Sequence, residues 1–122
     1  MCGIAGIFDF RAKGIANGPE LIKRMNNRME HRGPDSSGFW SSSSNEIYFG
    51  HQRLSILDLS EAGNQPMLSA SNKSSLVFNG EIFNYHELKS KIPQLNLKSS
   101  SDTEVLIELF AHNQLKYKEL NG

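Results

Sequence analysis

The sequence predicts an α+β fold, because it contains both strand-like and helix-like segments and its strands come early. Short apolar stretches typical of strands occupy residues 2–8, 46–50 and 75–79. Helical spacing of apolar residues occurs in residues 17–30, 84–92 and 101–113. A small sheet of early strands that packs against helices is typical of the α+β class.

The predicted strands are short and contain small residues. The first strand combines Ile4, Ile7 and Phe8 with two glycines, which allow another backbone to approach closely. The glycines, proline and aspartate of "HRGPDSSGF", residues 31–39, predict a break in regular structure. Residues 52–57 are expected to form a strand end or a loop.

Each predicted helix has a recognisable start. Pro19 lies near the first position of the first helix, where proline is tolerated. Asn84 is expected to cap the second helix, with Glu87 three residues later as in a capping box. Ser101 and Glu104 form the same signature before the third helix. The expected buried face of that helix comprises Val105, Leu106, Leu109 and Phe110.

Composition excludes several classes of protein. The chain has 13 Lys and Arg against 13 Asp and Glu, so it lacks the basic surplus of a nucleic-acid-binding domain. No apolar run approaches the ~20 residues of a membrane helix, and the start lacks the basic region of a signal peptide. One cysteine cannot form an internal disulfide, so a reducing, cytoplasmic location is expected.

Cys2, the cysteine of the chain, follows the initiator methionine. If Met1 is removed, Cys2 carries a thiol and a free α-amino group, whose ordinary pKa values of about 8.5 and 7.7–8.0 are well matched. The amine is then able to take the thiol proton, which gives a nucleophile and its base in one residue. The alternative is a small buried residue in an edge strand.

Asn79 and Gly80 follow the third predicted strand. The Asn79 side-chain amide and the Gly80 N–H are two donors suited to the oxyanion of a tetrahedral acyl intermediate. The alternative is a hairpin turn, for which Asn-Gly is a strong signal. The helical spacing of the following residues, "EIFNYHEL", argues against the hairpin.

Three charged residues complete the candidate set. Arg53 ends a predicted strand, and its guanidinium matches a carboxylate; the alternative is an exposed surface arginine. Asp102 and Glu81 are candidate carboxylates, although each is also suited to the first turn of a helix. The four histidines lack zinc-ligand spacing and "GPDSSG" lacks the ending of a phosphate loop, so no metal site is predicted.

Taken together, several stretches resemble the glutaminase domain of asparagine synthetase, in the order in which that family carries them. They are "MCGIAGIFDF", "HRGPDSSG", "HQRLSILDL", "QPM", "NGEIFNY" and "SDTEV". The resemblance covers residues 1–122, which are therefore expected to form a class II glutamine amidotransferase domain. It implies an N-terminal-nucleophile hydrolase fold, an αββα sandwich of two sheets between helices, of which this chain carries an incomplete part.

The resemblance also implies roles for the candidate residues. Cys2 attacks the side-chain amide of glutamine, with its own α-amino group as base and then as acid. Asn79 and Gly80 form the oxyanion hole. Arg53 binds the glutamine α-carboxylate, and Asp102 with Glu81 receives the α-ammonium. A glutamyl thioester forms and is hydrolysed to glutamate.

The family implies partners that this sequence does not itself provide. No cofactor is expected in the glutaminase domain. ATP and Mg²⁺ belong to a synthetase domain, which uses the ammonia to amidate aspartate and whose pyrophosphatase loop is absent from these residues. A synthetase domain or subunit is the expected partner, and a homodimer is a further expected association. The alternative function is a glutamine-binding or assembly module without turnover.

Overall fold

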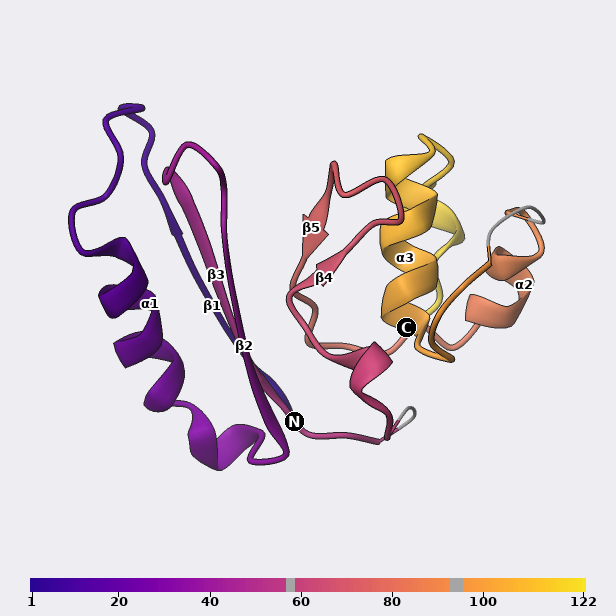
Figure 1. Cartoon of the computed structure of the whole chain (residues 1–122). Coiled ribbons are helices and arrows are strands. Elements are labelled where there is room, and N and C mark those ends of the chain that lie inside the picture. Colours follow the sequence, from indigo (N-terminus) through magenta and orange to yellow (C-terminus); the bar gives the residue numbers. More distant parts are fainter. Residues whose placement is uncertain (57–58, 93–95) are drawn as a thin grey trace. The chain divides into compact units, whose positions relative to one another are not determined.

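The computed structural model describes residues 1–56, 59–92 and 96–122 (Figure 1). The chain forms two compact units. The first comprises Met1–Ser55 with Asn64–Pro66, and the second comprises Ile56–Gly63 with Met67–Gly122. The chain contains both helices and strands, so the predicted α+β class is confirmed.

The first unit contains an antiparallel sheet in the strand order β1-β3-β2. Its strands are β1 (Gly3–Phe8), β2 (Ser36–Ser41) and β3 (Ile47–Arg53). Gly3 lies opposite Gln52 on β3, and Ser36 of β2 lies opposite Arg53. This register brings the start of β1, the start of β2 and the end of β3 to the same edge of the sheet.

Helix α1 (Gly18–Asn27) covers one face of this sheet. The buried cluster between them consists of Ala5, Ile22 and Tyr48. Gly18 is needed at the contact, because a Cβ there would lie 2.3 Å from the Tyr48 ring. The helix predicted over 17–30 ends earlier than expected, at Asn27, and residues 30–32 form a separate 3₁₀ turn.

The sequence did not predict strand β2, nor the short strand at Met67–Leu68 in the second unit. The first residues of β2 fall within the predicted break at 31–39, and its composition, "SSGFWS", is rich in serine and glycine. The strand forms because β3 supplies a complete ladder of partners from Ser36 to Ser41, and this tertiary pairing overrides weak intrinsic preference. The strand expected over 46–50 likewise continues to Arg53. Leu57, the last residue of the strand end or loop predicted over 52–57, lies outside the described residues.

The second unit contains a short β-ladder and two α-helices among its described residues. Strand β4 (Met67–Leu68) pairs with β5 (Ser75–Leu76), so the strand predicted over 75–79 is much shorter than expected. Helix α2 spans Tyr85–Lys89 and helix α3 spans Asp102–Ala111. Short 3₁₀ turns lie at Glu61–Gly63 and Tyr117–Glu119.

Helix α3 lies between α2 and the β4–β5 ladder, as Figure 1 shows, and is buried on more than one side. Its core cluster with α2 consists of Ile82, Leu88, Ile92, Val105 and Leu109. The expected buried face is confirmed at Val105 and Leu109, but Leu106 is only partly buried and Phe110 is 53% exposed. Ile107 and Glu108, which were not expected on that face, are 2% exposed. A single helical stripe could not predict this, because α3 packs against two neighbours.

The predicted helix caps are only partly correct. Ser101 caps α3, since its side chain accepts a hydrogen bond from the Thr103 N–H at 3.2 Å. The Glu104 carboxylate binds the Lys98 and Ser99 backbone N–H groups instead of completing a capping box. Asn84 precedes α2 but its side chain makes no capping hydrogen bond.

Candidate functional site

Cys2 lies immediately before β1, at the edge of the sheet where β3 ends. The Leu54 N–H donates a hydrogen bond to the Cys2 Sγ over 3.3 Å. The Cys2 carbonyl accepts a hydrogen bond from the Arg32 Nε at 3.2 Å. The cysteine is half-buried rather than enclosed in the core, so the interpretation of Cys2 as a small buried residue is wrong.

Arg53 is the last residue of β3 and is only 7% exposed, so it is not a surface arginine. Its Nη1 donates a hydrogen bond to the Asn64 Oδ1 over 2.9 Å. The same oxygen accepts a hydrogen bond from the Ser36 hydroxyl at 2.8 Å. The Arg53 backbone adjoins the Cys2 contact, because Leu54, whose N–H binds the Cys2 Sγ, directly follows Arg53.

Residues of the "HRGPD" stretch hold this end of the sheet, although the sequence assigned them no individual role. Arg32 binds the Cys2 carbonyl, as described above. The Asp35 carboxylate accepts a hydrogen bond from the Ser55 N–H at 2.7 Å, and the Asp35 N–H donates to the Arg53 carbonyl at 3.0 Å. The dense run of charged and turn-forming residues was the available signal, but only the fold shows what it contacts.

Asn79, Gly80 and Glu81 form an exposed segment between β5 and α2 in the second unit. Among the described residues no strand follows Gly80, so the hairpin interpretation is wrong. A Cβ on Gly80 would lie 2.6 Å from the far end of the Phe78 ring, so a larger residue here would require the Phe78 side chain to shift. The exposed segment leaves its side chains and backbone accessible to a small molecule.

Asp102 opens helix α3 and is 6% exposed. Its Oδ2 accepts a hydrogen bond from the Ile82 N–H at 2.8 Å, and its Oδ1 accepts one from the Thr103 N–H at 2.7 Å. Asp102 therefore connects the helix N-terminus to the residue that follows Glu81. The helix-terminus role, which the sequence left open, is present in the structure.

The predicted residues thus fall into two groups. Cys2 and Arg53 lie at one sheet edge of the first unit. Asn79, Gly80, Glu81 and Asp102 belong to the second unit, where the Asp102–Ile82 hydrogen bond joins the exposed segment to α3. The first unit thus contributes a thiol and a guanidinium to the candidate set, and the second contributes an amide side chain, a glycine N–H and two carboxylates.

The described residues contain no cluster of three or more His, Cys, Asp or Glu side chains placed to hold a metal ion. Within the same ranges, no helix has the length and apolar content that crossing a membrane requires.

Comparison with known proteins decides the family. Residues 1–122 match the glutamine amidotransferase domain family. The chain belongs to this family. The resemblance of the amidotransferase chain to the glutaminase domain of asparagine synthetases is confirmed by its relatives, as follows.

The amidotransferase chain is 40% identical over 122 residues to asparagine synthetase [glutamine-hydrolyzing] 1 of Bacillus subtilis, covering 98% of the chain and 18% of the relative. It is 40% identical to putative asparagine synthetase [glutamine-hydrolyzing] 2 of Methanocaldococcus jannaschii, covering 100% of the chain and 26% of the relative. It is also 32% identical to amidase chry2 of Gibberella zeae, over 96% of the chain and 19% of that protein. The chain therefore spans about a fifth to a quarter of these relatives' lengths.

Proposed function

We propose that this amidotransferase domain hydrolyses the side-chain amide of glutamine to glutamate and ammonia, with Cys2 as nucleophile. The observation that carries the proposal is the half-buried Cys2 thiol at the sheet edge beside Arg53, in a chain that matches the amidotransferase family throughout. Removal of Met1 is required, because the nitrogen of Cys2 is otherwise an amide without basicity.

The reaction begins when the free α-amino group of Cys2 takes the thiol proton and Sγ attacks the amide carbon of glutamine. The Asn79 side-chain amide and the Gly80 N–H bind the oxygen that becomes negative. The ammonium of Cys2 returns its proton to the leaving nitrogen, and the C–N bond breaks to release ammonia. Water then attacks the thioester, which gives glutamate and restores the thiol.

Substrate recognition follows from charge. Arg53 pairs with the α-carboxylate of glutamine, and Asp102 with Glu81 receives the α-ammonium. In this proposal the Asn64 amide keeps the buried Arg53 fork in place before substrate arrives. A free amino acid satisfies both charges, whereas a glutamine inside a peptide satisfies neither.

The product ammonia is proposed to serve an ATP-dependent amidation of aspartate on a synthetase domain or subunit outside these residues. ATP and Mg²⁺ would bind there and not in this domain. Support comes from relatives whose names describe glutamine-hydrolysing asparagine synthetases. The alternative is a module that binds glutamine without turnover, which retention of Met1 would favour.

The test combines intact mass with ammonia release. A chain that begins at Cys2 is expected to release ammonia from glutamine, and Cys2→Ala is expected to reduce the release to background because no nucleophile remains. Glutamine binding, measured by calorimetry, should change less than about threefold in this variant, since the binding charges are intact. A processed, folded chain that binds glutamine but releases no ammonia would contradict the catalytic proposal and support the binding module.

A further inference from the structure

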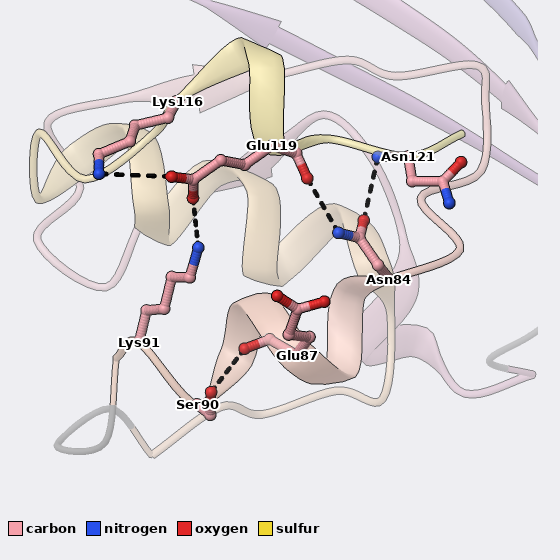
Figure 2. A network of polar contacts seen from close by, with 7 residues as sticks. All are labelled: Asn84, Glu87, Ser90, Lys91, Lys116, Glu119 and Asn121. Carbon is pink, nitrogen blue, oxygen red and sulfur yellow. Dashed lines mark hydrogen bonds and ion pairs between the residues drawn. The ribbon is translucent and has the colours of Figure 1, made fainter.

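The residues that follow the exposed segment Asn79–Glu81 are hydrogen-bonded to the backbone of residues 119–121. The Phe83 N–H donates a hydrogen bond to the Asn121 carbonyl at 2.6 Å. Asn84 continues this pairing with its side chain, as Figure 2 shows: Nδ2 donates to the Glu119 carbonyl over 2.9 Å. The Asn84 Oδ1 accepts from the Asn121 N–H at 3.0 Å.

The Asn84 side chain therefore acts as a peptide group toward the backbone of residues 119–121. Both ends of its amide are used, one as donor and one as acceptor, which fixes the orientation of the side chain. An aspartate keeps the acceptor and loses the donor. An alanine loses both and leaves the Glu119 carbonyl and the Asn121 N–H without these partners.

The partner segment is itself anchored. The Glu119 carboxylate pairs with Lys91, which follows α2, and lies 3.3 Å from the Lys116 Nζ (Figure 2). Leu120 packs against the apolar cluster of α2 and α3. Asn84 thus connects the segment that begins at Asn79 to a backbone held by both charge and burial.

We propose that Asn84 is a positioning residue for the oxyanion donors. By locking residues 83 and 84 onto the segment 119–121, while Asp102 holds the Ile82 N–H, it sets the backbone direction of Gly80 and Glu81. This inference depends on the proposed function, because it concerns the donors that act on the glutamine amide. A donor displaced by about 1 Å is enough to reduce a rate a hundredfold.

The experiment compares Asn84→Ala and Asn84→Asp with Asn121→Ala in the full chain. Asn121→Ala removes a side chain from the same segment and keeps the backbone N–H and carbonyl that the contact uses. We expect Asn84→Ala to lower kcat for glutamine hydrolysis at least about tenfold, with KM within about threefold, because oxyanion donors act in the transition state. Asn84→Asp should fall between Asn84→Ala and wild type, and Asn121→Ala should match wild type.

Amide hydrogen exchange gives a second readout that does not depend on activity. Residues 79–83 should exchange faster in both Asn84 variants than in wild type or Asn121→Ala. Equal exchange and equal kcat in Asn84→Ala and Asn121→Ala would overturn the inference, as would an effect confined to KM. If Asn84→Ala does not fold, as judged by circular dichroism, Asn84→Asp decides by the same criteria.

Failure of the proposed function has a different signature. A processed wild-type chain that releases no ammonia contradicts glutamine hydrolysis whatever the variants do. The hold of Asn84 on the segment is then decided by exchange alone: faster exchange in Asn84→Asp supports it, and exchange equal to that of Asn121→Ala overturns it.

Discussion

At the residue scale, the candidate site is made of side chains that also hold the fold together. Arg53 binds Asn64, and Asp102 accepts hydrogen bonds from two backbone N–H groups. Such groups are buried and oriented before any ligand is present, which lowers the entropic cost of binding one. The same property means that their substitution affects both stability and function, so the two effects need separate measurement.

At Asp102, two substitutions can separate the effect on stability from the effect on glutamine binding. Asp102→Ala leaves the buried Ile82 N–H without an acceptor and should lower the free energy of unfolding by about 1–3 kcal/mol, measured by urea denaturation. Asp102→Asn keeps one oxygen for that N–H and should lower the free energy of unfolding less. If the carboxylate also receives the glutamine ammonium, Asp102→Asn should still weaken glutamine binding about tenfold or more.

The result that would contradict a binding role is Asp102→Asn with unchanged affinity for glutamine. In that case the carboxylate would act only at the N-terminus of α3. Calorimetric titration of the folded Asp102→Asn variant with glutamine distinguishes a binding role of the carboxylate from a role only at the helix N-terminus.

At the element scale, β2 shows how close backbone contact replaces intrinsic strand preference. Gly38 lies opposite His51 on β3, and the Gln65 carbonyl oxygen lies where a side chain at position 38 would project. A Cβ on Gly38 would lie 1.9 Å from that oxygen, a distance that backbone atoms cannot accommodate without moving. The glycine therefore allows residues 64–66, including the Asn64 that binds Arg53, to lie against the strand.

Gly38→Ala is expected to destabilise the chain by more than about 2 kcal/mol, because the backbone of residues 64–66 has to move. Gly6→Ala on β1 is the matched control, since a Cβ there would lie 3.6 Å from the Phe49 ring, an ordinary contact. Its free energy of unfolding should stay within about 0.5 kcal/mol of wild type. Equal unfolding midpoints for the two variants would show that the contact with Gln65 is unimportant.

At the scale of the whole molecule, the free energy of unfolding depends on pH because some charged side chains are paired in the folded state. The chain has equal numbers of acidic and basic residues, and Glu119 is an acidic residue that is paired with lysines. The hydrogen bond from Lys91 and then that from Lys116 lower the pKa of Glu119 from its ordinary value of 4.5. A carboxyl group whose pKa is lowered in the folded state stabilises the chain above its ordinary pKa and loses that contribution as pH falls through the lowered value.

Glu119→Gln should therefore lower the urea midpoint at pH 7, and the difference from wild type should shrink as the pH falls below 4.5 and through the lowered pKa of Glu119. High salt should reduce the difference at pH 7, because Glu119 is in contact with solvent. Glu87→Gln is a suitable control, since Glu87 is an exposed residue of α2 whose carboxylate lies outside the ion pairs of Figure 2. A difference between wild type and Glu119→Gln that does not shrink as the pH falls below 4.5 would contradict the ion-pair explanation.

The candidate site could be proposed from the sequence as a set of residue types, but the contacts of these residues could not be predicted. The positions of Cys2, Arg53 and the Asn79–Gly80 pair were evident from local features and from the family resemblance. Their surroundings were not, because the Asn64 and Leu54 partners depend on which strands become neighbours. The αββα arrangement stays a prediction.

The sequence by itself determined the Ser101 cap, because a cap depends on residues within one turn of chain, and the α+β class, because the residue patterns that predict each strand and helix are local. Tertiary structure decided the rest. Ser36–Ser41 forms a strand because it pairs with β3. The Asn84 side chain does not cap α2 as expected but binds the backbone of Glu119 and Asn121, which lie 35 and 37 positions further along the chain. Long-range partners compete with local ones for the same hydrogen-bonding groups, and local sequence shows only one side of that competition.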